Sequence, residues 1–366
     1  MPDFPPDLAC ARLDIDLGAI TENWRRLCAQ HPSGPVAGVV KADAYGLGAR
    51  HVAPALYQAG CRHFFVAVLS EALAIRDLVP EAMVMVLNGP VPGSEALYLS
   101  HDITPVLGSL ADIAAWGVAS RTAGRRLPAL LHIDTGMHRL GLSAAELAVL
   151  RDDHRRLEGI EVLYVMSHLV SSEVAGDPLN EQQRDRFAVV AAQLPRAARS
   201  FANSSGVFLG ALWQSDLGRP GAALYGINPT PDQPNPMRAV VRLSARVLAV
   251  RDVPPDQGVG YNATWRTGRP TRIVTAGIGY ADGLHRALSN RGKAFFDGRP
   301  LPLVGRVSMD LTTFDATDYP GVEPGCWLEI IGPHQSPDDL AALCDTNGYE
   351  VLTSLGHRIA RVYHPA

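Results

Sequence analysis

Residues 36–48 read Val-Ala-Gly-Val-Val-Lys-Ala-Asp-Ala-Tyr-Gly-Leu-Gly. The apolar run at 36–40 predicts a short buried strand. Lys41 follows it directly, and a charged side chain at the end of a buried strand is costly unless it is paired or used covalently. The alternative to a chemical role for Lys41 is an ion pair with Asp43. The stretch therefore predicts a strand that delivers a lysine to one edge of a sheet.

Apolar runs of the same kind alternate with helical segments as far as about residue 230. The strand-like runs cover residues 36–40, 63–68, 83–87, 103–107, 129–133 and 162–166, with weaker ones near 200–202 and 222–225. Amphipathic segments at 17–30, 143–157 and 180–194 predict helices in the same region. Eight alternations over this length are typical of a parallel (β/α)8 TIM-type barrel. We therefore expect an α/β fold with a barrel over residues 13–230.

The chain changes character after the predicted barrel. Four prolines exclude a helix or a central strand there and mark a linker: Pro229, Pro231, Pro234 and Pro236. Beyond them, β-rich runs at 239–250, 272–278, 301–307, 311–314 and 327–331 are separated by glycine and proline turns, with a single helical stretch at 338–344. We expect a mostly antiparallel β-domain over residues 237–366, with residues 1–12 packing on it.

Composition and charge exclude several classes of function. The 366 residues carry a formal net charge of −4 and no basic stripe, so nucleic acid is not an expected partner. The first residues lack the basic start and apolar run of a secretory signal, and no apolar stretch approaches the ~20 residues of a membrane span. Five scattered cysteines without metal-ligand spacing indicate reduced thiols in a cytoplasmic protein, and no metal site.

Polar residues follow the predicted barrel strands, at the mouth where barrel enzymes keep their active sites. Lysine is rare in this chain, because only Lys41 and Lys293 occur among 33 basic residues. Arginine stays protonated and cannot form an imine, so lysine chemistry has two candidates. Lys293 stands in a glycine-flanked turn of the β-domain, which leaves Lys41 as the better one. The other residues at the predicted rim are His132, Asp134, Arg139, His168, Asn203, Ser204, Ser205 and the stretch from Arg219 to Gly221.

Residues 39–48 resemble the cofactor-lysine signature of the bacterial alanine racemases. Further matches occur in the family's order at 134–141, 166–169, 202–206, 218–221, 258–261, 279–283 and 306–310, so the resemblance covers essentially the whole chain. It implies a barrel joined to a β-domain and racemisation of alanine with pyridoxal phosphate (fold-type III). It also implies a supply of D-alanine for cell-wall peptidoglycan.

The resemblance assigns the proton chemistry to two residues. Lys41 would hold pyridoxal phosphate as a Schiff base and then act as the base on one face of the substrate Cα. Tyr261 would act on the opposite face, because proton removal and return on a single face would preserve configuration. His168 and Arg219 match the network that supports the tyrosine. Arg219 would also face the pyridine nitrogen, and a guanidinium cannot protonate it.

Other residues correspond to the family's binding positions. Cofactor-binding matches are Tyr45, His168, Asn203, Ser204, Arg219 and the backbone of Gly221 and Ala222, with His357 where some relatives place a phosphate-binding tyrosine. Arg139 and the backbone of Met309 match the positions that hold the substrate carboxylate, and Tyr280 matches a tyrosine that narrows the entrance. The family joins these parts in a head-to-tail homodimer, so Tyr261 and Met309 would complete the partner's site.

The sequence departs from the family at His132. Many members have a lysine there that becomes carbamylated and orients the arginine matched by Arg139. Imidazole cannot form that stable carbamate, so an anion such as chloride, or another carboxylate, would have to hold Arg139. An ordinary strand-end histidine bonded to the backbone is an equally good interpretation of His132.

Alternative functions remain open. They are a racemase of broader specificity or one for another amino acid such as serine, a decarboxylase on the same two-domain plan, and a non-catalytic carrier of pyridoxal phosphate. A decarboxylase would be expected to carry a cysteine where Tyr261 stands, yet none lies between Cys61 and Cys326. A carrier would lack the β-domain.

Overall fold

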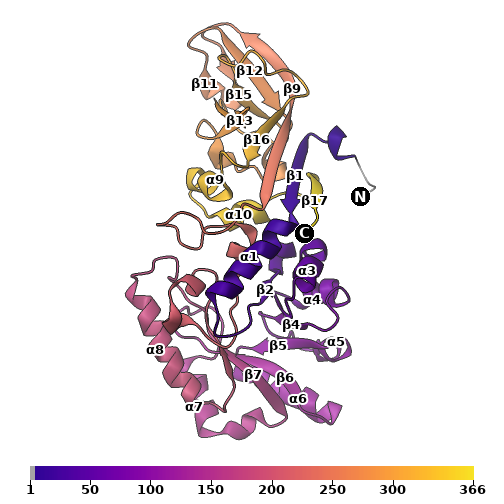
Figure 1. Ribbon diagram of the computed structural model, residues 1–366, viewed down its shortest axis with the longest axis vertical. Helices are drawn as coiled ribbons and strands as arrows, with labels where there is room; N and C mark the ends of the chain where they lie inside the picture. Colours follow the sequence, from indigo (N-terminus) through magenta and orange to yellow (C-terminus); the bar gives the residue numbers. More distant parts are fainter. Residues whose placement is uncertain (1–4) are drawn as a thin grey trace. The chain divides into compact units, whose positions relative to one another are not determined.

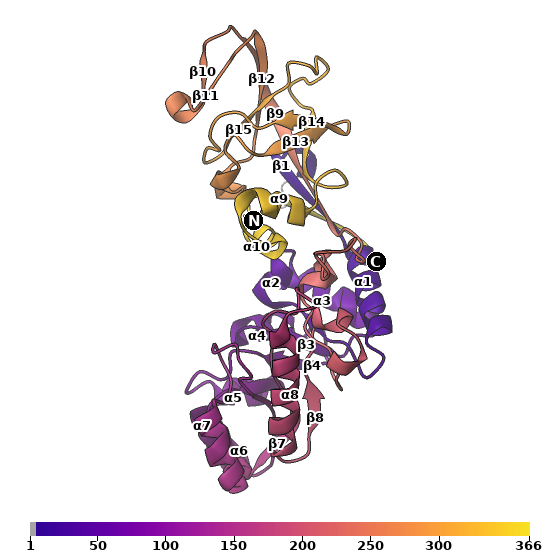
Figure 2. The same ribbon diagram turned by 90° about the vertical axis from the view of Figure 1, so that its left-hand side faces the viewer.

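The computed structural model describes residues 5–366, which form two compact units. One unit comprises residues 20–238, and the other comprises residues 5–19 together with 239–366. Each unit is described by itself below, and Figures 1 and 2 show their elements. Among the described residues, no helix is both long and apolar enough to cross a membrane. The domain limits of 13–230 and 237–366 remain predictions.

The unit of residues 20–238 contains a curled sheet of seven parallel strands in sequence order. The strands are β2 (Gly38–Val39), β3 (His63–Val66), β4 (Met83–Val86), β5 (Ile103–Leu107), β6 (Leu127–His132), β7 (Ile160–Met166) and β8 (Ala198–Ser200). Each overlaps a predicted strand run. Helices connect consecutive strands and lie outside the sheet (Figures 1 and 2), which confirms the predicted parallel α/β architecture.

The predicted helices are also found. Residues 17–30 form α1 (Leu17–Gln30), residues 143–157 contain α7 (Ala144–Asp152) and a 3-10 turn, and α8 (Pro178–Ala192) starts two residues before its predicted range. The remaining helices are α2 (Lys41–Tyr45), α3 (Ala49–Gln58), α4 (Leu69–Arg76), α5 (Glu95–Ser100) and α6 (Leu110–Ala123).

The eighth strand predicted at 222–225 is wrong. Those residues form a 3-10 helix, η5 (Ala222–Tyr225). The eighth place is taken instead by residues 217–219, which bond to residues 199–202 on one side (N···O 2.8 and 3.1 Å) and to residues 35–37 on the other (2.9 and 3.0 Å). Four apolar residues fit a buried turn as well as a buried strand, so their pattern alone could not separate the two.

Apolar side chains from successive strands fill the interior of the curled sheet. The cluster takes one residue from each of β2 to β7 and one from the eighth place: Val39, Phe65, Met85, Val106, Leu130, Met166 and Leu217. This layer is a packed core, as in other barrels. The polar residues that follow the strands therefore lie above it, at the carboxyl ends.

The second unit is built around a mostly antiparallel sheet in the order β14-β13-β16-β9-β1-β17, with β12 pairing both β9 and β15. The parallel pair is β1 with β17. The strands of this sheet are β1 (Ala11–Asp16), β9 (Val241–Val253), β12 (Thr271–Ala276), β13 (Lys293–Phe296), β14 (Arg299–Pro302), β15 (Thr312–Asp315), β16 (Trp327–Ile331) and β17 (Ala360–His364). A separate two-stranded sheet pairs β10 (Gly258–Val259) with β11 (Trp265–Arg266). The β-rich C-terminal fold is confirmed.

The prediction of a single helix in this unit is wrong. The expected helix is α9 (Pro337–Cys344), and α10 (Gly348–Thr353) follows it. The side chain of Asn347 caps α10 by accepting a hydrogen bond from the backbone of Glu350. Six residues are too few to display a helical period, so the cap was the available signal.

Candidate active site

Lys41 opens a left-handed turn at the carboxyl end of β2. The residues after it, from Ala42 to Tyr45, have φ angles between 52° and 56°. Residues other than glycine adopt this left-handed region at a cost of roughly 1–2 kcal/mol each. Backbone hydrogen bonds support the turn, from Ala44 to the Val40 carbonyl (2.9 Å) and from Gly46 to the Ala42 carbonyl (2.7 Å). Such concentrated strain is typical of functional sites.

The environment of Lys41 favours its neutral amine. Burial lowers the pKa of Lys41, and the nearby guanidinium of Arg139 lowers it further, while the carboxylate of Glu71 acts in the opposite direction. A neutral amine is the nucleophilic form of lysine and can also accept a proton. The alternative interpretation of Lys41, an ion pair with Asp43, is not found: the Asp43 Oδ1 accepts a hydrogen bond from the Ala49 backbone (2.7 Å).

Two hydroxyls and two backbone N–H groups converge near the start of η5. The Ser204 Oγ accepts hydrogen bonds from the backbone N–H groups of Gly221 (2.9 Å) and Ala223 (3.2 Å). A Cβ on Gly221 would lie 2.2 Å from the Tyr45 hydroxyl, so this hydroxyl packs directly on the glycine backbone. The Tyr45 ring in turn packs on Tyr225, with centroids 4.7 Å apart. Hydroxyls and amides gathered beside the last barrel strands can hold a phosphate.

Arg219 is a buried cation with neutral partners. It is 4% exposed, and its guanidinium donates to the Ser200 hydroxyl (2.6 Å) and the Ser167 carbonyl (2.5 Å). No carboxylate within residues 5–366 pairs with it. Burial lowers the pKa of Arg219 to about 10, so it stays protonated near neutral pH. A buried charge left without a counterion is a place where an acceptor on a ligand would be stabilised.

Two histidines beside this cation are held neutral. Burial and Arg219 lower the pKa of His132 to about 4, and the same two causes hold the pKa of His168 well below its ordinary value. Arg139 lowers both pKa values further. Arg139 itself is exposed, and in the described part of the chain it forms no ion pair. The predicted carboxylate partner of Arg139 is therefore not found there, and the anion remains a prediction.

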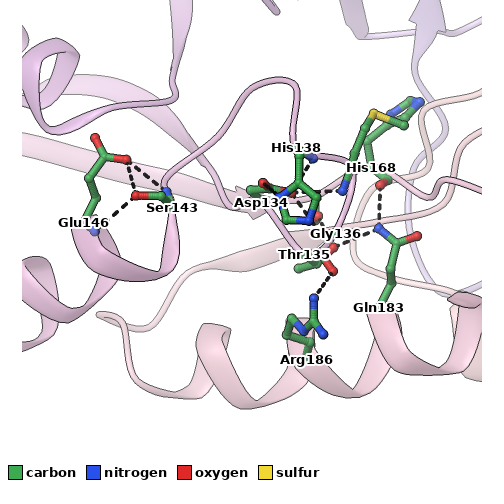
Figure 3. A network of polar contacts seen from close by, with 11 residues as sticks. Asp134, Thr135, Gly136, His138, Ser143, Glu146, His168, Gln183 and Arg186 are labelled. Carbon is green, nitrogen blue, oxygen red and sulfur yellow. Dashed lines mark hydrogen bonds and ion pairs between the residues drawn. The ribbon is translucent and has the colours of Figure 1, made fainter.

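Asp134 shapes the loop that carries Arg139 (Figure 3). Its Oδ1 accepts hydrogen bonds from the backbone of Gly136 (2.9 Å), Met137 (3.0 Å) and His138 (3.1 Å). The His138 ring closes the same loop on the other carboxylate oxygen, at 3.0 Å. Asp134, which was predicted at the rim, thus stabilises the conformation of this loop through its carboxylate.

Helix α8 supports the loops after β6 and β7 from below (Figure 3). The buried amide of Gln183 donates to the Thr135 hydroxyl (3.1 Å) and to the His168 carbonyl (3.0 Å). The hydroxyls of Thr135 and Ser167 share a further hydrogen bond of 2.7 Å. Sequence reasoning missed Gln183, since a glutamine within an amphipathic helix gives no local signal.

Asn203 and His357 lie in less distinctive surroundings. The Asn203 Oδ1 accepts hydrogen bonds from the Ser172 hydroxyl and the Gly206 backbone, both at 2.9 Å, which fixes the loop after β8. His357 is exposed in the turn before β17. The cofactor roles expected for both residues remain predictions.

The second unit brings together the backbones of Tyr280 and Met309. Tyr280 bonds to the Ser308 carbonyl (3.0 Å), and Ala281 bonds to the Met309 carbonyl (2.9 Å). The side chains of Tyr280 and Met309 are 44% and 54% exposed. Arg358 ties the two loops by pairing with Asp282 and with Asp310.

Tyr261 is also exposed, at 67% of its surface. It opens η6 (Tyr261–Ala263) after Gly260, whose φ is 69°. A Cβ on Gly260 would lie 3.3 Å from the Arg306 backbone nitrogen, so the loop of Tyr261 packs near the segment that leads to Met309. The three residues predicted from this unit thus stand on neighbouring loops with their side chains open to solvent.

Comparisons with known proteins agree over nearly the full length. Residues 15–229 match the model of the alanine racemase N-terminal domain, and residues 240–363 match that of the C-terminal domain. An alanine racemase of Acidiphilium cryptum is 53% identical over 96% of this chain and 98% of its own. One of Brucella abortus is 46% identical over 96% and 93%.

Solved structures give the same result. A crystal structure of alanine racemase from Bartonella henselae with covalently bound pyridoxal phosphate superposes with a TM-score of 0.95 at 43% identity, covering 97% of this chain and all of that one. The biosynthetic alanine racemase of Pseudomonas aeruginosa gives a TM-score of 0.90 at 34% identity, over 98% of this chain and all of that one. Because the two family models together match residues 15–229 and 240–363, this chain belongs to the alanine racemase family.

Proposed function

We propose that this chain interconverts L- and D-alanine, with pyridoxal phosphate attached covalently to Lys41. The observation that carries the proposal is the surroundings of Lys41. A half-buried lysine whose pKa is lowered lies at the barrel mouth among the cations Arg139 and Arg219 and two neutral histidines. Family membership supplies the reaction, and this setting supplies a reactive amine.

The residues present fit the cofactor. The hydroxyls of Tyr45 and Ser204 and the backbone N–H groups at Gly221 and Ala222 would hold the phosphate. Arg219 is a buried donor without a carboxylate partner, and it would face the pyridine nitrogen. When bound, pyridoxal phosphate supplies an aldehyde that condenses with an amine and a ring that withdraws electrons from the substrate Cα. Because Arg219 keeps its protons, it would donate a hydrogen bond to the ring nitrogen and would not protonate it.

Two bases would move the proton. The neutral amine of Lys41 takes the Cα proton on one face, and the Tyr261 hydroxyl supplies or takes one on the other. We propose that Tyr261 comes from the second subunit of a homodimer, in which His168 and Arg219 of the receiving subunit support it. The exposure of Tyr261, Tyr280 and Met309 on neighbouring loops supports such a docking face.

Arg139 and the backbone of Met309 would bind the substrate carboxylate. The exposed guanidinium of Arg139 has no partner in residues 5–366, so it is open to a carboxylate. Tyr280 would narrow the entrance, while Asn203 and His357 would complete the cofactor site. The five cysteines are free thiols, which supports a cytoplasmic location. We keep residues 13–230 and 237–366 as the proposed domain limits.

The test incubates the purified enzyme with L-alanine in deuterated water, alongside Lys41→Ala and Tyr261→Phe. We expect deuterium at Cα together with loss of optical activity. Tyr261→Phe should impair abstraction from one enantiomer, and Lys41→Ala should lose the covalent cofactor. If alanine is untouched while serine racemises, the substrate is wrong and the mechanism stands. Release of carbon dioxide would identify a decarboxylase, and no reaction with any amino acid would identify a carrier.

A further inference from the structure

Glu71 joins the start of α4 to the peptide that follows Lys41. Its Oε2 accepts hydrogen bonds from the backbone of Ala67 (2.8 Å) and Val68 (3.4 Å), as a glutamate in the first turn of a helix commonly does. Its Oε1 instead accepts a hydrogen bond of 2.7 Å from the backbone N–H of Ala42. One carboxylate thus connects two segments that are 29 residues apart in sequence.

Ala42 is the first residue of the left-handed turn, with φ 52° and ψ 47°. Later N–H groups of the turn bond within it, as Ala44 does to Val40 and Gly46 to Ala42. The Ala42 N–H lies before the first of these internal bonds, and Glu71 accepts it. The charged hydrogen bond therefore fixes the strained backbone at the point where Lys41 leaves the strand.

Glu71 also acts on the charge of Lys41. Burial and Arg139, on the loop after β6, favour the neutral amine of Lys41. His168, on the loop after β7, interacts with the same amine and is held neutral. Glu71, on α4, is the carboxylate that favours the protonated amine. It therefore limits how far the cations around Lys41 shift its titration.

We propose that Glu71 is a positioning residue for Lys41: its carboxylate holds the left-handed turn at Ala42 and thereby sets the direction in which the lysine side chain leaves the strand. This inference rests on the proposed function, in which Lys41 carries the cofactor. It assigns to Glu71 a part in cofactor attachment and proton transfer without contact with substrate.

A simple helix cap is the competing explanation, and the chain contains a matched case. Glu146 occupies the same position in α7, where its Oε2 accepts hydrogen bonds from the Ser143 backbone (3.0 Å) and hydroxyl (2.7 Å) (Figure 3). Its Oε1 accepts a hydrogen bond from the distant backbone N–H of Leu110 (3.1 Å). Glu146→Gln therefore reproduces the loss of a capping carboxylate without touching the turn after Lys41.

The experiment compares full-length Glu71→Gln, Glu71→Ala, Glu71→Ala/Ala42→Gly and Glu146→Gln with the wild type. Each enzyme is stripped of cofactor and mixed with pyridoxal phosphate across a pH series. Covalent attachment is trapped by borohydride, and the labelled Lys41 peptide is quantified by mass spectrometry. Thermal unfolding of each holoenzyme is recorded in parallel.

We expect Glu71→Gln to move the midpoint of attachment to lower pH by about half a unit, because loss of the anion favours the neutral amine. Glu71→Ala should reduce the attachment rate at the plateau by about tenfold, the usual effect of losing a charged hydrogen bond. Ala42→Gly should restore part of that rate, because glycine adopts positive φ without a Cβ penalty. Glu146→Gln should change neither quantity.

The proposal is overturned if Glu71→Gln and Glu146→Gln share one midpoint and Ala42→Gly rescues nothing. If Glu71→Ala does not fold, the pH midpoint of cofactor attachment in Glu71→Gln tests the proposal by itself. This variant should fold, because the glutamine amide keeps one oxygen that can accept the hydrogen bond from Ala42. Label on another residue in the wild type would instead refute the proposed function and leave the structural role of Glu71 unaffected.

Discussion

Replacing Gly221 by alanine should damage the cofactor site through a single contact. The φ of Gly221 is −121°, which an L-residue can adopt, so the conflict is steric. A Cβ would lie 2.2 Å from the Tyr45 Oη and 3.0 Å from its Cζ. The hydroxyl would have to retreat by about 1 Å to reach an ordinary contact, and such overpacking costs about 1–3 kcal/mol.

The double variant with Tyr45→Phe separates this contact from other effects. Without the hydroxyl, the nearest atom of the ring is Cζ, so Gly221→Ala should cost less in the phenylalanine background by about 1 kcal/mol or more. The assay is equilibrium titration of cofactor-stripped enzyme with pyridoxal phosphate, together with urea unfolding. Gly176→Ala is the control, because nothing lies within 4 Å of its Cβ position. An equal cost of Gly221→Ala in both backgrounds would refute the steric argument.

Three further predictions concern the loops around Arg139. His132 has a pKa of about 4 when folded and about 6.5 when unfolded, so the unfolded chain binds the extra proton as the pH falls through this window. The contribution of the neutral His132 to stability is therefore complete above about pH 6.5 and is lost as the pH falls toward about 4. In urea unfolding, the wild type should lose about 2 kcal/mol of unfolding free energy between pH 7.5 and about pH 5, and His132→Gln should not show this loss. Equal losses in both proteins would contradict the role of His132. If an anion holds Arg139, initial rates should fall in chloride-free buffer and recover with sodium chloride, and full activity without chloride would remove the idea. Gln183→Leu should lower the free energy of unfolding by about 1–3 kcal/mol, because the Thr135 hydroxyl and the His168 carbonyl would lose their hydrogen-bond donor. The same change at the exposed neighbour Gln182 should alter the free energy of unfolding little. A similar effect of both variants would contradict the network.

The sequence predicted most of the barrel because its strands are buried on both faces. Runs such as residues 36–40 and 83–87 contain no polar side chain and have clear ends, so their pattern supports the strand assignment. Lys41 was predictable for the same reason, since a lone charge at the end of such a run stands out. The strand predicted at residues 222–225 was wrong because four apolar residues between glycines are compatible with a buried turn as well as with a strand.

The supports of the site were not predictable. Glu71 reads as a helix cap, Gln183 as an ordinary helical glutamine, and the left-handed run after Lys41 contains alanines that favour right-handed helix. Each acts through a partner distant in sequence, such as Ala42 for Glu71 and Thr135 for Gln183. Tertiary contacts of this kind override local preference, and no periodic pattern encodes them.

Burial and the cations at the barrel mouth together explain why the pKa values of Lys41, His132 and His168 are all lowered. The protein as a whole is acidic, with a net charge of −4, yet the buried Arg219 and the exposed Arg139 both act on the titratable groups of this mouth. Burial lowers the pKa of Lys41, His132 and His168, and the neighbouring cations lower these pKa values further. An anionic ligand at this mouth would offset the repulsion and raise these pKa values again. The same arrangement therefore shifts Lys41 toward its neutral, nucleophilic form, and it would stabilise an anionic ligand beside the cations.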